Sequence, residues 1–334
     1  MHEKTTSPTS LEQCRAAVAP FELPDHRRAL WQILNTLGSY VVLWALVPWA
    51  LAISWWLAIP IVLLGGGLLV RIFIIFHDCS HGSFLRSRRA NRWLGSVCAW
   101  LAFTPPYQWG WEHARHHATS GDLDRRGAGD MWTLTVEDYR SASKWKRRAY
   151  RFARNPLVLF VMAPIFIFVV IQRFLPPQSS QRERRSIWAT NVAVVAMVAA
   201  MMWVVGPLTY LVIQLGIMAV GGSAGVWLFY LQHQFEDVYW ERHDQWSYTE
   251  AALRGSSYLR LPKILQWFSG NIGFHHVHHL SPKIPNYHLE RCHRSDPIFE
   301  DVPTLGFRES LRSAFLALWD ESEGKLVSFR RARA

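Results

Sequence analysis

Cysteine is scarce in this chain, and its placement excludes two kinds of site. The four cysteines are widely separated, and no two of them form a C-x-x-C pair. A disulfide framework or a thiolate zinc site normally requires paired, closely spaced cysteines. Any metal would therefore have to be bound by other side chains.

Two further features are missing from the sequence. No glycine-rich loop follows an expected strand, so a bound flavin or nicotinamide cofactor is not indicated. Residues 1–30 are polar and lack the apolar core of a secretory signal peptide. The first hydrophobic run is therefore expected to remain in the protein as a membrane span.

Apolar residues, by contrast, are abundant. The chain is 50% hydrophobic and contains 18 Trp and 18 Phe, together with long apolar runs. This composition is typical of an integral membrane protein. The net charge of +11 is explained by a basic cytoplasmic face beside anionic lipid. We expect no nucleic acid partner, because the basic residues flank apolar runs instead of alternating with exposed aromatic residues.

Four apolar runs predict transmembrane helices at about residues 40–57, 61–77, 187–205 and 208–231. Pro60 and the Gly206-Pro207 pair mark the turn within each pair of helices, and neither turn carries Lys or Arg. The positive-inside rule places such turns outside the cell, which puts both termini in the cytoplasm. Arg71, within the second run, is expected to extend its side chain toward the membrane surface.

Two other apolar segments are predicted to lie in the membrane interface. Residues 93–103 are too short to span, and residues 157–175 have basic residues on both sides and a break at Pro164. Residues 1–30 are interpreted as an irregular or partly disordered cytoplasmic arm that could end in an interfacial helix, residues 31–310 as the membrane domain and residues 311–334 as a basic tail. The predicted fold is all-α, with four spans, interfacial helices and a histidine-rich cytoplasmic cap.

Histidines occur in three clusters with helical spacing. The first has two rings four positions apart, and the other two repeat the spacing i, i+3, i+4, which places the rings on one helix face. Such rings are costly to bury on an apolar protein unless something binds them. His276 interrupts the third cluster and is expected to point elsewhere. The candidate ligands are His77, His81, His113, His116, His117, His275, His278 and His279, with His233 at the end of the last span as a ninth.

Nine imidazoles are too many for one ion and suit two ions with open coordination positions. Neutral imidazole binds iron, zinc, copper and nickel, and the sequence does not rank these metals. Three residues near the clusters are candidates for orienting the rings: Asp78, Glu112 and Asn271. The loop Asp122–Arg126 is interpreted as a solvated run of charge.

The order and form of these clusters resemble the membrane-bound fatty acid desaturases. The matching segments are His77-Asp78-Cys79-Ser80-His81, His113-Ala114-Arg115-His116-His117 and His275-His276-Val277-His278-His279, within a resemblance from about residue 40 to residue 300. The form is similar to the acyl-lipid omega-6 (delta-12) type, although Ser80 stands where that type often has Gly. The stretch Tyr230–Gln234 is similar to the family's segment that supplies an additional ligand.

The resemblance implies a non-haem di-iron enzyme. Such an enzyme uses dioxygen and two electrons to introduce a cis double bond into an acyl chain of a membrane lipid. No His-Pro-Gly-Gly segment of a fused cytochrome b5 domain is present, so the electrons would come from a separate ferredoxin or cytochrome b5. We expect this acidic carrier to dock on the basic segment Lys144–Arg154.

Two alternatives stay open at the level of sequence. A hydroxylase, a ketolase or an alkane monooxygenase of the same superfamily could use the same ligands, since only the second oxidation step differs. A zinc-binding receptor, hydrolase or transporter could also cluster histidines. A transporter, however, would need polar groups at mid-membrane depth, and these clusters lie at span ends and in the cap.

Overall fold

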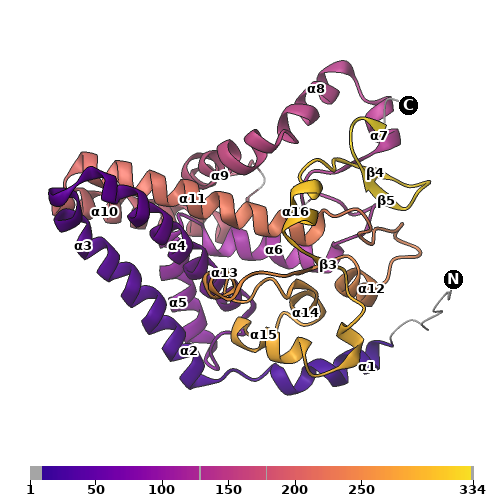
Figure 1. The fold of residues 1–334 in the computed structure, drawn as a ribbon, viewed down its shortest axis with the longest axis horizontal. Helices are drawn as coiled ribbons and strands as arrows, with labels where there is room; N and C mark the ends of the chain where they lie inside the picture. The colour runs from indigo at the N-terminus through magenta and orange to yellow at the C-terminus, as the bar shows by residue number, and fades with distance from the viewer. Residues whose placement is uncertain (1–9, 128, 178, 332–334) are drawn as a thin grey trace.

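The computed structural model describes residues 10–127, 129–177 and 179–331, and most of these residues are helical. Within these ranges, four helical segments are long and apolar enough to cross a membrane, which confirms the predicted number of spans. They are His26–Ile53, Trp55–His81, Gln181–Val205 and Pro207–His233. In Figure 1 the spans fill the left side of the molecule and the cap fills the right side.

The first two spans are each built from consecutive helical pieces. The first contains α2 (His26–Ile33), a π-helical stretch (Leu34–Gly38) and α3 (Ser39–Ile53), and the second contains a 3-10 turn (Trp55–Leu57) and α4 (Ala58–His81). The first span begins well before residue 40, and the turn after it lies at Ser54; the turn predicted at Pro60 is wrong, because Pro60 lies in the first turn of α4, where a proline is tolerated. Its start is capped by Asp25, whose carboxylate accepts hydrogen bonds from the backbone N–H groups of Arg27 and Arg28.

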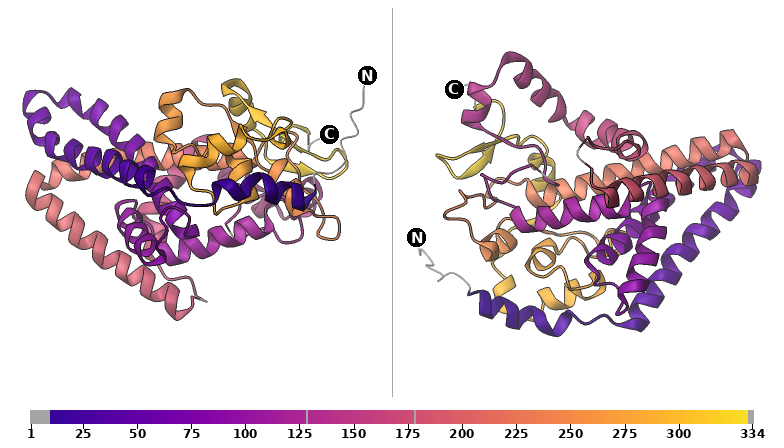
Figure 2. Two further views of the ribbon diagram at one scale, coloured as in Figure 1. Left: turned by 90° about the horizontal axis from the view of Figure 1, so that it is seen from below. Right: turned by 180° about the vertical axis from the view of Figure 1, so that it is seen from behind.

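Helices α4 and α11 form the centre of the membrane part. α11 (Pro207–His233) runs parallel to α4 and packs against it. α10 (Gln181–Val205) comes before α11 in the chain, and the turn at Gly206 places these two helices beside each other (Figure 2). A Cβ on Gly66 would lie only 3.1 Å from the backbone nitrogen of Gly221, so glycine allows the two helices to approach closely. α4 ends with the first histidine cluster and α11 ends with His233. The contact between the two helices therefore fixes the distance between these candidate ligands.

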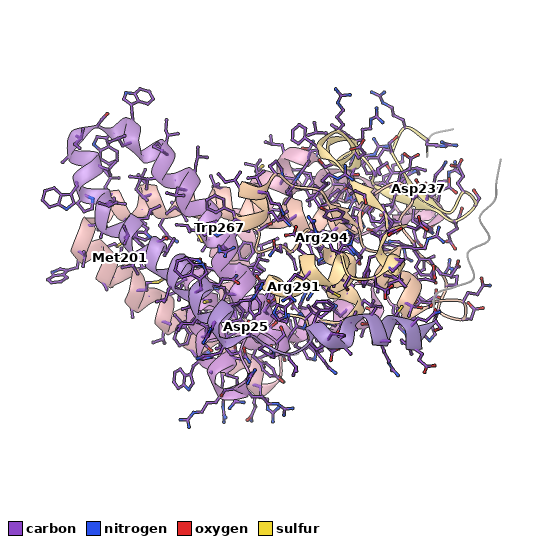
Figure 3. All side chains as sticks on the ribbon, turned by 60° about the horizontal axis from the view of Figure 1, so that its bottom comes forward. Asp25, Met201, Asp237, Trp267, Arg291 and Arg294 are labelled. Atoms are coloured by element: carbon purple, nitrogen blue, oxygen red, sulfur yellow. The ribbon has the colours of Figure 1, made fainter. Side chains whose placement is uncertain are left out.

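Arg71 does not extend toward the membrane surface, and that prediction is wrong. Its side chain is buried, and its Nε donates a hydrogen bond to the Thr36 hydroxyl at 3.0 Å. Its guanidinium also donates to the carbonyl of Trp267 and lies over the indole of that residue, which is labelled in Figure 3. Because neighbouring segments supply acceptors inside the protein, the charge has no need to reach water.

Two helices connect the first pair of spans to the rest of the chain. α5 (Arg88–Leu101) packs along the end of α4, where a Cβ on Gly95 would lie 2.9 Å from Cβ of Cys79. α6 (Pro106–Thr119) carries the second histidine cluster. Neither is among the candidate spans, and the interfacial position of residues 93–103 stays a prediction.

The apolar segment after residue 157 is helical but does not break where we expected. α8 (Lys144–Ala153) meets the helical segment Val158–Arg173 at a bend of 61°. The helix continues through Pro164, with α9 (Ala163–Ile165) between π-helical stretches (Val158–Met162 and Phe166–Val170) and a final 3-10 turn (Ile171–Arg173). The π-helical turns accommodate the ring, so the break lies before Val158 and not at Pro164. The interfacial position of this segment stays a prediction.

The described part of the N-terminal arm is ordered, contrary to our expectation of an irregular segment. It forms α1 (Leu11–Val18) and a 3-10 turn (Ala19–Phe21), and Ser10 and Gln13 form a capping box at the start of α1. Cys14 and Val18 are buried in a cluster with Val277 from the third histidine segment. α1 has only eight residues, which is too short for a clear helical pattern in the sequence. Its contact with the cap stabilises the helix. Residues 1–9 of the arm lie outside the described residues.

After α11 the chain forms the cap from short elements. These are α12 (Tyr248–Leu253), β2 (Tyr258–Leu259), α13 (Lys263–Phe268), α14 (His275–Leu280), α15 (Asn286–His293), a 3-10 turn (Pro297–Phe299), β3 (Thr304–Leu305), α16 (Phe307–Ser313), β4 (Leu318–Asp320) and β5 (Lys325–Val327). β2 pairs in parallel with β3. β4 pairs antiparallel with β5 and in parallel with β1 (Leu134–Thr135), which precedes α7 (Val136–Ser141). The segment predicted as a basic tail therefore contains an ordered hairpin.

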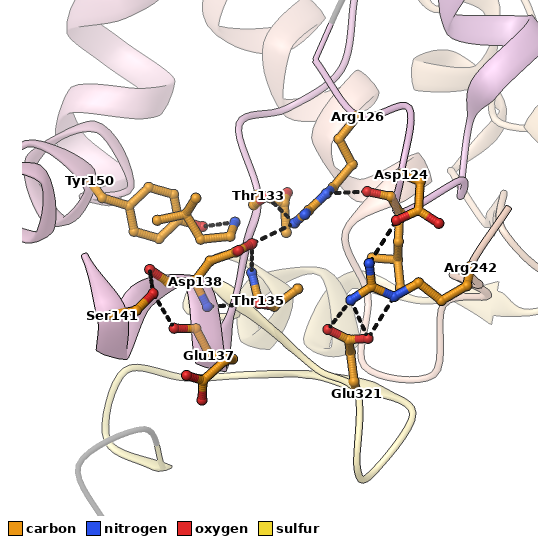
Figure 4. A network of polar contacts seen from close by, with 12 residues as sticks. Asp124, Arg126, Thr133, Thr135, Glu137, Asp138, Ser141, Tyr150, Arg242 and Glu321 are labelled. Carbon is orange, nitrogen blue, oxygen red and sulfur yellow. Dashed lines mark hydrogen bonds and ion pairs between the residues drawn. The ribbon is translucent and has the colours of Figure 1, made fainter.

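Charged side chains connect the loop after α6 to this cap (Figure 4). Arg242 pairs with Asp124 and with Glu321, each at 2.7 Å. Asp122 is buried and accepts a hydrogen bond from Nδ1 of His243 at 2.7 Å. The interpretation of this loop as a solvated run of charge holds for Asp124 and Arg125, which are exposed, but is wrong for Asp122, which is buried and bonds a group distant in the sequence.

Candidate metal centre

The structure brings all nine candidate histidines together as two adjacent groups. Within each group, one ring nitrogen from every member lies within 4.8 Å of those of the others. The groups touch: the ring centroids of His117 and His279, one from each group, are 4.2 Å apart. The first group is His77, His81, His113, His117 and His278, and the second is His116, His233, His275 and His279.

Four helices supply these rings, and helical spacing decides how they are shared. α4 contributes only to the first group and the end of α11 only to the second. α6 contributes two rings to the first group and one to the second, whereas α14 contributes one to the first and two to the second. The spacing i, i+3, i+4 thus spreads the rings of one helix over both groups. His233, which had the weakest sequence signal, lies at the centre of the second group.

Backbone and carboxylate acceptors fix the protonation of three of these rings. Asp78 Oδ1 accepts from Nδ1 of His77 at 2.9 Å, and Asp130 Oδ1 accepts from Nδ1 of His116 at 2.5 Å. The carbonyl of Gly255 accepts from Nδ1 of His233 at 3.3 Å. Because these oxygens can only accept, each ring carries its proton on Nδ1 and leaves the lone pair of Nε2 free.

The orienting residues differ from the predicted set. Asp78 contacts a clustered ring as expected, and it also accepts from the backbone N–H and the side-chain amide of Asn286 at 2.6 and 2.8 Å. Asn271 instead donates to the carbonyl of Asn286, and Glu112 accepts from the Gln108 amide. Among the described residues, neither of these two forms a hydrogen bond with a clustered ring, and their role in orienting the rings stays a prediction.

Asp130 was missed by the sequence analysis. It follows His117 by a loop without regular structure, so no helical spacing connects it to the ring that it contacts. The only available signal was an acidic residue within a glycine-containing loop after the cluster, and this signal is common. His276 points away from both groups, as predicted, and its Nε2 lies 3.0 Å from Nδ1 of His293.

Ring nitrogens within each group face one another at short distances. In the first group, Nε2 of His117 lies 3.1 Å from Nε2 of His113 and 2.9 Å from Nε2 of His278. The second group repeats this pattern around His233, with 3.1 and 2.9 Å to its neighbours from α6 and α14. One neutral ring nitrogen can make a hydrogen bond with only one of two such neighbours. Two nitrogens bound to the same ion at about 2.0–2.1 Å lie about 3 Å apart when adjacent, so the observed spacing suits metal binding.

Further ring nitrogens are buried without any hydrogen-bond partner among the described residues. They include Nε2 of His81 and His279. A buried polar atom without a partner is unfavourable by about 1–3 kcal/mol. The orphaned nitrogens and the facing pairs together show that this donor set fits metal ions.

Burial also keeps five of the rings neutral, as metal binding requires. Burial first, and neighbouring histidines second, lower the pKa of His113, His117, His275, His278 and His279 well below its usual range. A neutral imidazole has a lone pair that a metal can bind.

An apolar cavity of about 340 Å³ adjoins both groups. Its walls include His77, His113 and His275, and beyond them it runs between α4, α11 and the segment 158–173. Trp109 is stacked on His113 with ring centroids 4.5 Å apart and lines the same cavity. The cavity is near the lower end of the volume range of ligand pockets, and its walls suit an apolar ligand.

These features define a class: a membrane protein with a histidine-rich centre suited to metal beside a cavity for an apolar substrate. A family model described as fatty acid desaturase matches residues 53–305, which include all nine histidines. The chain belongs to the fatty acid desaturase family, which confirms the resemblance drawn from the three clusters. It is therefore a desaturase enzyme of lipid metabolism.

Curated relatives agree with this assignment. A fatty acid desaturase of Bacillus subtilis is 45% identical over 319 residues, which cover 96% of this chain and 91% of the relative. An sn-1 acyl-lipid omega-3 desaturase (ferredoxin) of Synechocystis is 26% identical over 87% of this chain and 85% of the relative. An sn-1 oleoyl-lipid 12-desaturase of the same strain is 27% identical over 80% of this chain and 75% of the relative.

Proposed function

We propose that the two histidine groups hold two iron ions and that the enzyme introduces a cis double bond into a lipid acyl chain lying in the cavity. The division of nine clustered imidazoles into groups of five and four carries this proposal, since it leaves coordination positions free at both. When bound, the irons supply, with dioxygen and two electrons, an oxidant able to take hydrogen from an unactivated methylene. Side-chain acids, bases or nucleophiles alone do not act on such a carbon.

The residues around the centre hold protons and exclude water. Asp78 and Asp130 keep the Nδ1 protons of His77 and His116 in place and direct the Nε2 lone pairs into the groups. The cavity walls position the chain by shape, because a saturated chain offers no polar group to bind. Trp109 and Phe73, whose ring centroids are 5.1 Å apart, close the wall next to His113 and keep solvent from the reacting carbon.

We further propose that a separate one-electron carrier, a ferredoxin or a cytochrome b5, reduces the centre. One relative carries ferredoxin in its name. The exposed cations of α8 offer a surface for an acidic protein, with Lys144, Lys146 and Arg148 at the surface. Arg154, by contrast, is buried and donates to Gln234 at 2.9 Å, so it is not part of this surface.

Charge reversal tests the docking surface. Replacing Arg147 and Arg148 by Glu should slow reduction by the carrier and weaken its dependence on salt concentration. Stopped-flow reduction of the enzyme at several ionic strengths measures both. An unchanged salt dependence would place the carrier elsewhere.

Metal analysis and product analysis test the main proposal. Purified protein should contain about two irons per chain, and replacing His233 by Ala should remove about one of them. His276→Gln is the matched control, because His276 is also a buried histidine but belongs to neither group. Mass spectrometry should show a product that has lost two hydrogens. A product that has gained an oxygen atom would indicate a hydroxylase, and one zinc per chain would contradict the di-iron centre.

A further inference from the structure

Three glycines of α11 line the cavity, and packing explains two of them. A Cβ on Gly221 would lie 3.0 Å from the carbonyl oxygen of Gly66, and a Cβ on Gly222 would lie 3.1 Å from Cβ of Pro164. Both glycines are therefore required by the close approach of a neighbouring segment. The third cavity glycine is Gly225.

Gly225 has no such neighbour. Apart from its chain neighbours and the backbone of its own helix, no atom of the described residues lies within 4 Å of the place that its Cβ would occupy, whereas a Cβ on Gly216 of the same helix would lie 2.8 Å from the side chain of Val62. The backbone at Gly225 is right-handed helix, so no left-handed conformation requires glycine there. Glycine is also a poorer helix former than alanine. Neither backbone nor packing accounts for glycine at this position.

The place of Gly225 along the cavity suggests its role. It precedes His233 by just over two helical turns, which correspond to about 12 Å along the axis of α11. The cavity continues on α11 to Met218, about 10 Å further from the histidines. A side chain at position 225 would therefore project between the part of the cavity at His77 and His275 and the part at Met218.

We propose that Gly225 determines how much of an acyl chain the cavity accepts beyond the histidine groups, and hence the chain-length and double-bond selectivity of the enzyme. This inference rests on the proposed function for the nature of the chain in the cavity. A methyl group at position 225 would displace a methylene of the chain, and larger side chains would close the far part of the cavity. One methylene changes discrimination in an apolar pocket by about 10- to 200-fold.

A graded set of variants tests this proposal. Gly225→Ala and Gly225→Val both remove the glycine, but they add side chains of different volume. An effect on chain binding that grows from Ala to Val is therefore caused by the volume that the side chain occupies in the cavity, and not by the lost backbone flexibility of glycine. Gly38→Val is the matched control, because Gly38 is also a helical glycine without an atom within 4 Å of its Cβ position, but it is exposed and does not line the cavity.

Binding is measured on the purified full-length protein by displacement of cis-parinaric acid with a homologous series of saturated fatty acids. We expect Gly225→Val to weaken binding of the longest chains by about 10-fold or more and to leave short chains unaffected. Gly38→Val should match the wild type. Fatty-acid profiling of cells that express each variant should show shorter substrates or a displaced double bond for Gly225→Val.

The outcomes separate this inference from the function on which it rests. An identical chain-length series for the wild type and Gly225→Val would overturn the role of Gly225, even if both proteins desaturate. A wild type that shows the expected series but forms no double bond would overturn the proposed reaction and leave the role of Gly225 intact. A wild type that binds no chain would overturn both.

Discussion

Asp130 lies in a loop and contacts His116 of the second histidine group. Its carboxylate holds the Nδ1 proton of His116, and removing an acceptor of this kind typically lowers metal affinity by about 10- to 100-fold. We therefore expect Asp130→Ala to lose iron from the second group at chelator concentrations that the wild type withstands. Iron content after titration with a chelator measures this loss.

The control for that experiment is another acidic residue near a candidate ligand. Asp237, labelled at the right of Figure 3, is exposed and follows His233 in the sequence. Asp237→Ala should retain iron like the wild type. Equal iron loss in both variants would show that Asp130 has no specific role in orienting His116.

At the scale of residues, the sequence was informative where a spacing repeats and uninformative where contacts are distant. Eight of the histidines were found because the helical spacing and the order of the three clusters are visible in the sequence, and His233 was added because it lies at the end of the last predicted span. Asp130, the Arg71–Thr36 hydrogen bond and the role of Gly225 depend on segments that only the fold brings together. Asn271 is near His275 in sequence, but its positive φ of 59° turns the chain, and its amide bonds Asn286 instead.

Helix α15 holds the N-terminal arm through a titratable side chain. His288 is buried and donates from Nδ1 to the carbonyl of Phe21 at 3.1 Å. Burial lowers the pKa of His288, the hydrogen bond to Phe21 opposes this, and the positive charges of Arg28 and Arg291 lower it further. When the arm is undocked, the His288 ring is exposed and has its ordinary pKa of about 6.5.

The sign of this shift gives a pH dependence. As the pH falls below about 6.5, the undocked state takes up a proton that the docked state resists, so docking of residues 10–22 becomes weaker as the pH falls. Hydrogen exchange of α1 should therefore become faster on acidification than its intrinsic rate predicts. His288→Gln can still donate to the carbonyl but does not titrate, and its α1 should show no such excess. Equal behaviour of the two proteins would contradict the role of His288.

At the scale of elements, the long apolar helices were predicted well and the short elements were not. Four spans and the turn at Gly206 follow from hydropathy and from turn residues. The break expected at Pro164 did not occur, because π-helical turns absorb the ring. The strands have only two or three residues each, and such lengths give no alternating pattern that a sequence can reveal.

The whole molecule should be oriented with its histidine groups on the cytoplasmic side. This prediction follows from turns without Lys or Arg at one end of the spans and from basic segments at the other. All four native cysteines are buried, so they should contribute little background to surface labelling. An engineered Ser54→Cys should react with an impermeant maleimide added outside cells, and Ser322→Cys should react only after lysis. The opposite pattern would invert the proposed topology.

The hydrogen bond from the backbone N–H of Asp25 to the Tyr287 hydroxyl joins positions that are 262 residues apart. The ribosome therefore releases α1 and the start of the first span long before their partner on α15 exists. During synthesis this early segment must wait beside the membrane while the remaining spans insert. Its docking is among the last steps of maturation, and a chain that stops before α15 would lack the surface that holds its own beginning.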